Sequence, residues 1–376
     1  MYWKLNMEYY GKLIQGESGN SYLLGKKVGD GGEGTVYLIP DKKLVAKIYK
    51  QKFPQEEQKI RYMVYHPIDD LPPDRAIGNF SFQLAWPQDI LHDESGSFIG
   101  YVMPYIDNVV EILTISRGCD TLAAQKLIPD YNRAFNVLVA LNLAKTVEYL
   151  HCKNCIIGDL NHKNIFVTST GGIVILDNDS FDLIDETTGE HYRCCVGTQD
   201  YLAPELQGRD LKSENTSFSF YSDDFSLAVH IFQLLMSNFH PFSCRNYNTK
   251  LNSSSTNLRV ERIAHGISPF VHNYSDLAIP ISAPTLEEIL PKFLIADFYQ
   301  TFCYTEAEVS TLKGNRTSAA MWRADLEKYW QMILDPHECI QCKNNPTHFY
   351  LRYQHECGLC RAKKRAQKLL RQANTL

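Results

Sequence analysis

Short apolar runs separated by turns occupy much of the first half of the chain. Such runs predict strands, and they lie at residues 22–28, 35–39, 44–49, 98–105, 165–167 and 173–176. Two longer segments are helical in pattern: residues 135–150 carry apolar residues at helical spacing, and residues 222–236 are apolar almost all round. The pattern predicts strands in the first part of the chain and buried helices after them.

A glycine-rich turn joins the first two of these strands. Residues 29–36 read Gly-Asp-Gly-Gly-Glu-Gly-Thr-Val. Only glycine lets backbone N–H groups approach a phosphate without a Cβ in the way, although an ordinary glycine-rich hairpin has the same composition. The candidate nucleotide-binding residues of this turn are Gly29, Gly31, Gly32, Gly34 and Val36.

Lys47 lies in the apolar strand that follows the glycine turn. Burying an unpaired ammonium is costly, so this lysine needs anionic partners. The phosphates of a nucleotide and a glutamate from the next helix are the expected ones. Glu56 is preferred because it shares a helical face with Ile60 and Met63, and Glu57 remains the alternative.

Asp159 and Asn164 stand five residues apart just before one predicted strand, and Asp177 follows the next. Each residue alone also fits a turn or a helix cap. Their joint spacing suits phosphoryl transfer, in which a carboxylate orients the attacking hydroxyl while a carboxamide and a second carboxylate hold Mg²⁺ on the phosphates. The sequence therefore predicts one cleft for these three side chains.

Together, these motifs resemble the protein kinase superfamily over residues 22–330. The resemblance implies an α+β, two-lobed fold, with a small β-rich N-lobe at 1–104 and a larger helical C-lobe at 105–335. It makes Asp159 the catalytic base, and Asn164 and Asp177 ligands of the Mg²⁺ that accompanies ATP.

The same resemblance implies where the adenine ring is bound. The strand at residues 98–105 leads into the hinge between the lobes, with Met103 in the gatekeeper place. Pro104 and Ile106 offer backbone groups to adenine, and Ala46 is a further expected contact.

Three positions depart from the kinase pattern. Ile157-Gly158 stands where the family has His-Arg, so the arginine that clamps a phosphorylated activation loop is missing. Asn161 replaces the lysine that neutralises the transferring phosphate, which could lower turnover. Asn178-Asp179 replaces Phe-Gly after the metal-binding aspartate. A catalytically weak, nucleotide-binding pseudokinase scaffold is therefore the alternative to an active enzyme.

Residues 196–205 are close to the Gly-Thr…Ala-Pro-Glu stretch of protein Ser/Thr kinases, which favours a protein substrate. We expect Thr198 to bond near Asp159, and Glu205 to pair with Arg316 because an unpaired buried carboxylate is expensive. Asp223 is expected to anchor the backbone of the catalytic loop. His230, further along the same predicted helix, is interpreted as a core residue.

Four of the 11 cysteines form two Cys-x2-Cys pairs in a C-terminal unit at 336–376. Cys339, Cys342, Cys357 and Cys360 have spacing suited to one tetrahedral, structural Zn²⁺, because a unit this short has little core of its own. His348 is a rival ligand. The sequence thus predicts a small zinc ribbon after the two lobes.

Taken with the ribbon, the glycine-loop and catalytic-loop motifs resemble bacterial kinases linked to helix-hairpin-helix DNA-binding modules. Some of these belong to tellurite-resistance-type triads with a von Willebrand A-domain protein and a PP2C-type phosphatase, and the resemblance implies such partners. Basic residues concentrate after Cys360, at Arg361, Lys363, Lys364, Arg365, Lys368 and Arg371. A solvated helix or a contact with nucleic acid or an acidic partner both fit that charge.

Composition adds little to this picture. The chain of 376 residues is 44% hydrophobic and 12% aromatic, which allows a large core. No run reaches the length of a membrane helix and the start lacks a secretion signal, so we expect a cytoplasmic protein. Residues 246–257 are interpreted as a polar loop. The sequence as a whole predicts an ATP- and Mg²⁺-dependent protein serine/threonine kinase, with an adaptor role for the zinc tail as a further alternative.

Overall fold

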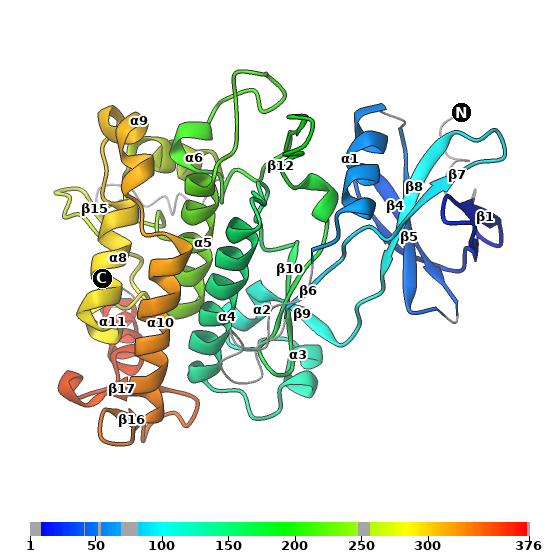
Figure 1. Ribbon diagram of the computed structural model, residues 1–376. Helices are drawn as coiled ribbons and strands as arrows, with labels where there is room; N and C mark the ends of the chain where they lie inside the picture. The colour runs from blue at the N-terminus through cyan, green and yellow to red at the C-terminus, as the bar shows by residue number, and fades with distance from the viewer. Residues whose placement is uncertain (1–8, 41, 52–53, 69–81, 247–255, 374–376) are drawn as a thin grey trace.

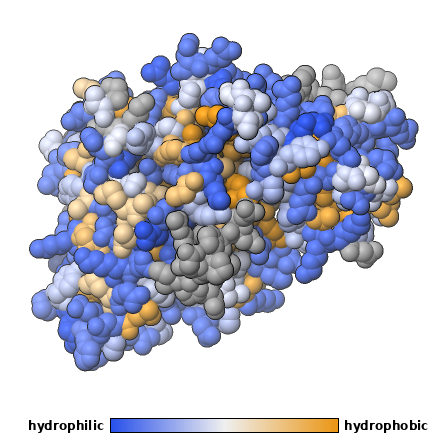
Figure 2. Space-filling view, in the orientation of Figure 1, coloured by the Kyte–Doolittle hydropathy of each residue, from blue (hydrophilic) through white to orange (hydrophobic). Residues whose placement is uncertain are grey.

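The computed structural model describes residues 9–40, 42–51, 54–68, 82–246 and 256–373. A β-rich part and a larger helical part lie side by side, and the C-terminal segment packs against the helical part (Figure 1). This is the α+β arrangement expected from the sequence. Figure 2 shows a mostly hydrophilic face, on which hydrophobic residues gather most clearly where the two parts meet.

A seven-stranded antiparallel sheet forms the β-rich part, in the order β2-β1-β7-β8-β5-β4-β3. Its strands are β1 (Leu13–Gly16), β2 (Ser21–Leu23), β3 (Lys27–Asp30), β4 (Gly34–Ile39), β5 (Leu44–Tyr49), β7 (Asp89–His92) and β8 (Phe98–Pro104). Helix α1 (Pro54–Tyr65) packs beside the sheet, where Trp86 Nε1 donates to Met63 O at 2.8 Å. The glycine turn therefore connects two paired strands, β3 and β4.

The strand expected at residues 22–28 is divided in two at Gly25. Leu24 N still bonds to Lys12 O, on the β1 side, whereas Gly25 N bonds to Leu38 O, on the β4 side. A Cβ on Gly25 would lie 3.0 Å from Leu38 O, which is tighter than most such contacts. The chain changes its pairing partner at this glycine, and this ends β2 before β3 begins.

The two faces of the large sheet bury different residues. Side chains alternate along a strand, so Val45 and Lys47 of β5 share one face with their β8 partners Met103 and Tyr101. Val45, Tyr101 and Met103 join the core shared with the helical part, whereas Ala46, Ile48 and Val102 join a separate core on the opposite face.

A second sheet lies between the two parts, in the order β6-β11-β10-β9. Its strands are β6 (Phe82–Leu84), β9 (Val109–Glu111), β10 (Ile165–Thr168) and β11 (Ile173–Ile175). Because β10 and β11 are antiparallel, with Ile165 opposite Ile175, the residues before β10 and after β11 emerge at one end. Leu176 N bonds to Asn164 O there at 2.9 Å.

Long helices build the remaining core. The helical segments expected at residues 135–150 and 222–236 are found as α4 (Arg133–Cys152) and α5 (Phe220–Leu235), and α10 (Ala319–Leu334) packs along α4. The shorter helices are α2 (Ile112–Ser116), α3 (Leu122–Leu127), α6 (Thr256–His265), α7 (Leu286–Ile289), α8 (Lys292–Phe302) and α9 (Val309–Leu312). Fully buried aromatic rings, among them Phe232, Phe298 and Trp322, fill the space between α5, α8 and α10. Each such ring contributes about 1.5–3 kcal/mol by leaving water.

The C-terminal segment folds as a hairpin of β16 (Cys339–Gln341) and β17 (Phe349–Leu351), followed by α11 (Gly358–Ala373). It is joined closely to the helical part: Arg133 N donates to Thr347 O at 2.8 Å, and a Cβ on Gly358 would lie 2.1 Å from Glu288 O. Only glycine allows that approach. This packing gives the segment a core that its own length could not supply.

Two further expectations concern loops and membranes. The polar loop expected at residues 246–257 falls largely on 247–255, outside the described residues; next to it Arg245–Asn246 (β14) pairs with Leu277–Ala278 (β15). None of the helices in the described ranges has the length and apolar character needed to span a bilayer.

Candidate functional site

The glycine turn lies directly over Lys47. Val36 is opposite Lys47 in the sheet, so the two side chains share a face. Gly31 N bonds to Gly34 O at 2.9 Å and closes the turn. A Cβ on Gly34 would lie 2.8 Å from Ile48 O and 3.3 Å from the Lys47 side chain. Glycine at this position thus lets the turn lie close against β5.

Lys47 is buried among carboxylates, as its position in an apolar strand predicts. Its Nζ lies 2.6 Å from Asp177 Oδ1 and 2.7 Å from Asp179 Oδ2, with Glu33 of the glycine turn at 3.8 Å. Burial alone lowers the pKa of Lys47, but the charges of Asp179 and Asp177 raise it above its ordinary value. The lysine is therefore a permanent cation facing the glycine turn.

Neither glutamate of α1 is the partner of Lys47, which corrects our expectation. Glu57 pairs with Arg61 at 3.2 Å. Glu56 points inward as expected, yet its Oε2 is buried without a hydrogen-bond partner among the described residues. Burial raises the pKa of Glu56, and Glu33 raises it further. The inward orientation of Glu56 on α1 was predicted correctly. Lys47, however, is paired with Asp177 and Asp179.

The expected contact between Ala46 and the adenine ring is also wrong, because Ala46 does not lie on the face of Lys47. Ala46 is fully buried on the sheet face opposite Lys47, in the separate core of the β-rich part. Val45 shares the face of Lys47 and lies opposite Met103. The alternation of side chains along a strand was the signal that could have identified Val45, because it stands two residues before Lys47.

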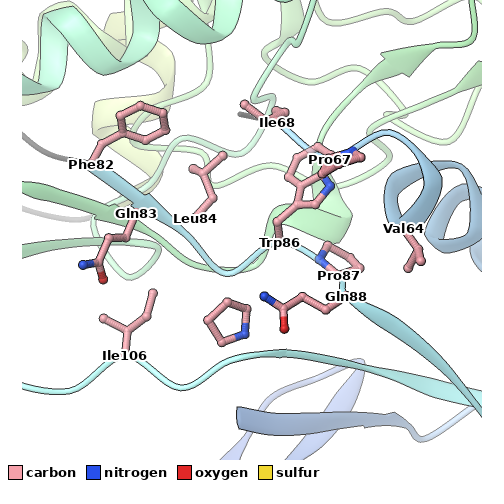
Figure 3. Close-up of a pocket in the computed structure, with 11 residues that line it drawn as sticks. Val64, Pro67, Ile68, Phe82, Gln83, Leu84, Trp86, Pro87, Gln88 and Ile106 are labelled. Carbon is pink, nitrogen blue, oxygen red and sulfur yellow. The ribbon is translucent and has the colours of Figure 1, made fainter. Parts of the chain in front are cut away.

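The expected hinge residues line a pocket of about 450 Å³ between α1, β6 and the end of β8 (Figure 3). Pro104 and Ile106 form one wall, and Trp86, Gln88 and residues of β6 face them. Lys47 and the expected catalytic and metal-binding residues Asp159, Asn164 and Asp177 do not line this pocket. The adenine contacts through backbone groups of the hinge therefore remain a prediction.

Asp159 is held at both carboxylate oxygens. Thr198 N donates to Oδ1 at 2.8 Å, and Asn161 Nδ2 donates to Oδ2 at 2.8 Å. Asn161 itself is only 4% exposed and accepts from Lys163 N at 2.8 Å. The predicted contact between Thr198 and Asp159 is confirmed, although it is made by backbone N–H. These bonds fix the direction in which the carboxylate points.

Asn164 lies on the same loop as Asp159 and at the same end of the hairpin as Asp177. Its Nδ2 donates to Asp159 O at 3.2 Å, which directs its carboxamide oxygen away from that carbonyl. Asp177 has φ 59° and ψ 41°, a left-handed conformation that a short helical turn at Asn178–Ser180 maintains. Burial and the neighbouring charge of Asp179 raise the pKa of Asp177. Oxygen donors of this kind suit a hard cation such as Mg²⁺.

The catalytic-loop backbone is anchored by α5, as expected. Ile157 N and Gly158 N donate to the two oxygens of Asp223 at 2.6 and 3.0 Å. His230 is a fully buried core residue, stacked on Tyr201, with its Nε2 3.0 Å from Leu160 O. Burial lowers its pKa to about 3, so the ring is neutral.

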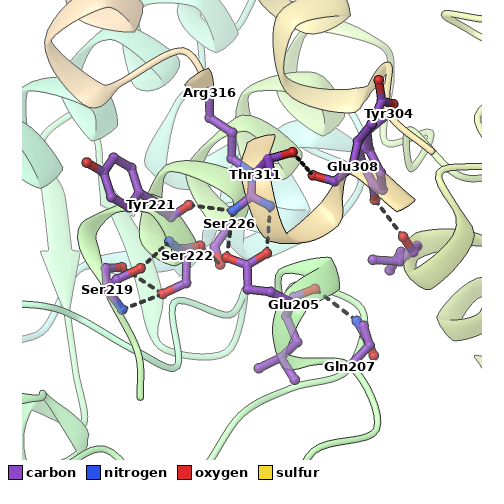
Figure 4. A network of polar contacts seen from close by, with 12 residues as sticks. Glu205, Gln207, Ser219, Tyr221, Ser222, Ser226, Tyr304, Glu308, Thr311 and Arg316 are labelled. Carbon is purple, nitrogen blue, oxygen red and sulfur yellow. Dashed lines mark hydrogen bonds and ion pairs between the residues drawn. The ribbon is translucent and has the colours of Figure 1, made fainter. Parts of the chain in front are cut away.

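The segment after Thr198 is fixed by the expected ion pair. Arg316 donates from two nitrogens to the two oxygens of Glu205, at 2.8 and 2.6 Å, and also to Tyr221 O at 2.9 Å (Figure 4). The arginine side chain is 3% exposed and that of Glu205 16%. The bidentate pair joins the Ala-Pro-Glu turn to the segment before α10, and the bond to Tyr221 O links both to the start of α5.

The C-terminal segment gathers four potential metal ligands: Cys342, His348, Cys357 and Cys360, whose donor atoms lie within 4.8 Å of one another. Cys339, expected as the fourth ligand, lies outside this group on β16, opposite Leu351. Cys342 N bonds to His348 O at 3.0 Å and closes a turn that brings the imidazole in instead. Of the two rival residues, His348 lies in this cluster and Cys339 lies outside it.

The basic helix α11 has an acidic partner elsewhere in the same chain. Arg361 Nε and Arg365 Nη1 lie 2.9 and 2.6 Å from the same oxygen of Glu288 on α7. Arg365 also donates to Ala283 O at 2.9 Å. These partners are more than 70 residues away in sequence, so the local charge pattern could not reveal them.

The sequence matches the family described as "Protein kinase domain" over residues 109–299, just over half of the chain. It is 28% identical over 354 residues to protein kinase YegI of Escherichia coli strain K12. The aligned region covers 91% of this chain and 49% of the relative. A probable serine/threonine-protein kinase of Clostridium perfringens is 25% identical over 230 residues, or 60% of this chain and 29% of the relative. Kinase suppressor of Ras B of Caenorhabditis elegans is 28% identical over 177 residues, which are 43% of this chain and 32% of the relative.

The chain spans about half the length of YegI. Asp159, Asn164, Asp177 and the Ala-Pro-Glu segment lie within the matched residues, whereas the glycine turn and Lys47 precede them. The chain belongs to the protein kinase domain family.

Proposed function

We propose that the chain is an ATP- and Mg²⁺-dependent protein serine/threonine kinase. The observation that carries the proposal is the setting of Asp159, which is bonded by both Asn161 of its own loop and Thr198 of the substrate-side segment. A carboxylate fixed between these two elements can accept the proton of a hydroxyl presented to the cleft. Relatives named as serine/threonine kinases support the choice of acceptor.

The remaining roles follow from the donor groups. The carboxamide oxygen of Asn164 and the carboxylate of Asp177 suit Mg²⁺, and Lys47 and the N–H groups of the glycine turn suit phosphate oxygens. Bound Mg²⁺ would neutralise charge on the phosphates of ATP. Gly29, Gly31, Gly32, Gly34 and Val36, in and beside the turn between the paired strands β3 and β4, would cover the phosphates.

A protein substrate is supported by the fixed substrate-side segment. Glu205 and Arg316 hold the Ala-Pro-Glu turn, and Thr198 links the same segment to Asp159. The acceptor hydroxyl and the catalytic base can therefore be positioned by one rigid element.

The test compares phosphate incorporation from γ-labelled ATP in wild type, Asp159→Asn and Asp210→Asn. Asp210 lies on a surface loop, where it caps Lys212 N, and supplies a matched carboxylate-to-amide control. Loss of incorporation in Asp159→Asn alone supports the kinase. Equal incorporation in all three would point to the weak pseudokinase scaffold or a contaminant.

For the tail, we propose a structural Zn²⁺ held by Cys342, His348, Cys357 and Cys360. Three thiolates and one imidazole would supply four protein ligands and leave no open position, which suits a structural rather than a catalytic ion. The packing of Gly358 against Glu288 supports a role in stabilising the C-lobe.

Partner contacts are a further part of the proposal. Lys363, Lys364 and Lys368 are exposed on α11 and could meet nucleic acid or an acidic protein surface. The motif resemblance to helix-hairpin-helix-linked kinases suggests a von Willebrand A-domain protein and a PP2C-type phosphatase as candidates. Titration of the chain with labelled duplex DNA, and with each candidate protein, would show which of these binds and whether changing all three lysines to Glu abolishes binding.

A further inference from the structure

Lys47 is bound by one short turn after β11. Asp179 contributes two contacts, with Lys47 Nζ 2.9 and 2.7 Å from its oxygens, and Asp177 contributes one at 2.6 Å. The side chain of Asp179 is 5% exposed, whereas that of Asp177 is 39% exposed. Of the two carboxylates, Asp177 is therefore the one accessible to solvent, and Asp179 is buried.

Asp179 is itself fixed from a second direction. Tyr49, two residues after Lys47 on the same strand face, donates its hydroxyl to Asp179 Oδ2 at 2.7 Å. The turn carrying the carboxylate is pinned as well, since Asn178 Nδ2 donates to Ile175 O and Ser180 Oγ donates to Asp177 O. Asp179 thus has little freedom to leave the lysine.

Helix α1 packs against this turn and carries a buried cation beside the inward-facing Glu56. Lys59, one turn after Glu56, is 7% exposed. Burial lowers its pKa, and the charges around it that act in the opposite direction include Asp179 and Asp182. Asp179 therefore lies in the field of two buried lysines, one on β5 and one on α1. In the expected arrangement, a glutamate of α1 would pair with Lys47. In the structure, Asp179 supplies the carboxylate, and α1 places the ammonium of Lys59 near Asp179.

We propose that Asp179 is the positioning residue for Lys47, holding its ammonium toward the phosphates in place of a glutamate from α1. The inference rests on the proposed kinase function and deepens it. When Asp177 serves a metal ion, Lys47 keeps its bonds to Asp179, so its placement depends on the Asn178–Ser180 turn and not on the position of α1.

The test uses Asp179→Asn, Asp179→Glu and the control Glu56→Gln. Two measurements are made: kcat and KM for ATP, and the rate at which an ATP acyl phosphate acylates Lys47. Acylation is followed by mass spectrometry over a pH series and compared per neutral amine, because loss of the Asp179 charge also lowers the pKa of Lys47. We expect Asp179→Asn to lower kcat/KM by about 100-fold, as for loss of a preorganised charge contact, and to slow Lys47 acylation. Asp179→Glu should restore part of both, and Glu56→Gln should change neither.

Wild-type values in Asp179→Asn, or an equal loss in Glu56→Gln, would overturn the proposal. If Asp179→Asn does not fold, Tyr49→Phe removes the second support of Asp179 while keeping the ring; slower acylation then supports the proposal, and an unchanged rate contradicts it. A wild type that transfers no phosphate, with acylation still dependent on Asp179, would reject the kinase function and retain the positioning role.

Discussion

Arg316 and Glu205 form a bidentate ion pair between the loop before α10 and the Ala-Pro-Glu turn, with both hydrogen bonds at 2.8 Å or less. The pair is almost enclosed, and the guanidinium also lies 5.3 Å from the ring centre of Phe225. Breaking a buried pair leaves a carboxylate without compensation. We therefore expect the pair of Arg316 and Glu205 to stabilise the helical part of the protein.

Arg316→Ala should lower the free energy of unfolding by about 3 kcal/mol, because Glu205 loses both donors in a poorly hydrated site. Chemical denaturation measures the change. Arg323→Ala is the control: its pair with Glu148 is about one-third exposed on the arginine side and should contribute less than about 1 kcal/mol. Equal losses of unfolding free energy in the two variants would show that the buried pair with Glu205 stabilises the protein no more than the exposed pair does.

His348→Ala should lose the bound Zn²⁺, whereas Cys339→Ser should retain about one ion per chain, because only His348 lies in the ligand cluster. Metal content after dialysis is the measurement. Removal of the ion by a chelator should also lower the melting temperature of the C-lobe, since the tail packs on Glu288 and Arg133. Zinc loss in Cys339→Ser with retention in His348→Ala would reverse the ligand assignment.

Asn161→Ala should lower kcat by about tenfold with little change in KM for ATP, because Asp159 loses the donor that orients its carboxylate. Steady-state kinetics distinguish the two constants. A second substitution, Asn161→Lys, introduces the lysine that the kinase pattern has at this position. It tests the alternative that the missing positive charge limits turnover. A large increase in kcat for Asn161→Lys would favour the pseudokinase-like interpretation of the wild type.

Asp224 predicts a pH dependence of stability. Its carboxylate is buried on α5 and accepts from Ala319 N, and burial raises its pKa from 3.8 to about 7. The folded state therefore binds a proton more tightly than the unfolded state, and stability is lost as pH rises from about 4 to 7. Asp224→Asn should remove this loss, so its stability relative to wild type should grow across that window and stay constant above it. Melting temperatures of both proteins across the range provide the check, and a constant difference would contradict the assignment.

Local patterns predicted most of the fold. The continuous apolar run of β5, the helical periods of α4 and α5, and the spacing of Asp159, Asn164 and Asp177 are all short-range signals. The partner of Lys47 could not be predicted in this way, because Asp179 lies 132 residues away and its contact depends on how the two lobes meet. Glu288 and the arginines of α11 form a second long-range relationship of the same kind.

Errors within the candidate site have specific physical reasons. Ala46 was assigned to the wrong face although strand alternation indicates Val45. Cys339 was preferred because its spacing to Cys342 is regular, whereas the turn closed by Cys342 N and His348 O selects the histidine. Glu56 was predicted to face inward, and it does, but the lysine it was meant to meet is already paired.

The central claim is that Lys47, Asn164 and Asp177 meet a magnesium-bound triphosphate beneath the glycine turn. Diffraction from crystals grown with Mg²⁺ and a non-hydrolysable ATP analogue tests it most directly. We predict oxygens of Asn164 and Asp177 about 2.1 Å from the metal, with Lys47 still bonded to Asp179 and in contact with the phosphates. Phosphates bound elsewhere, or a metal coordinated without either residue, would contradict the account.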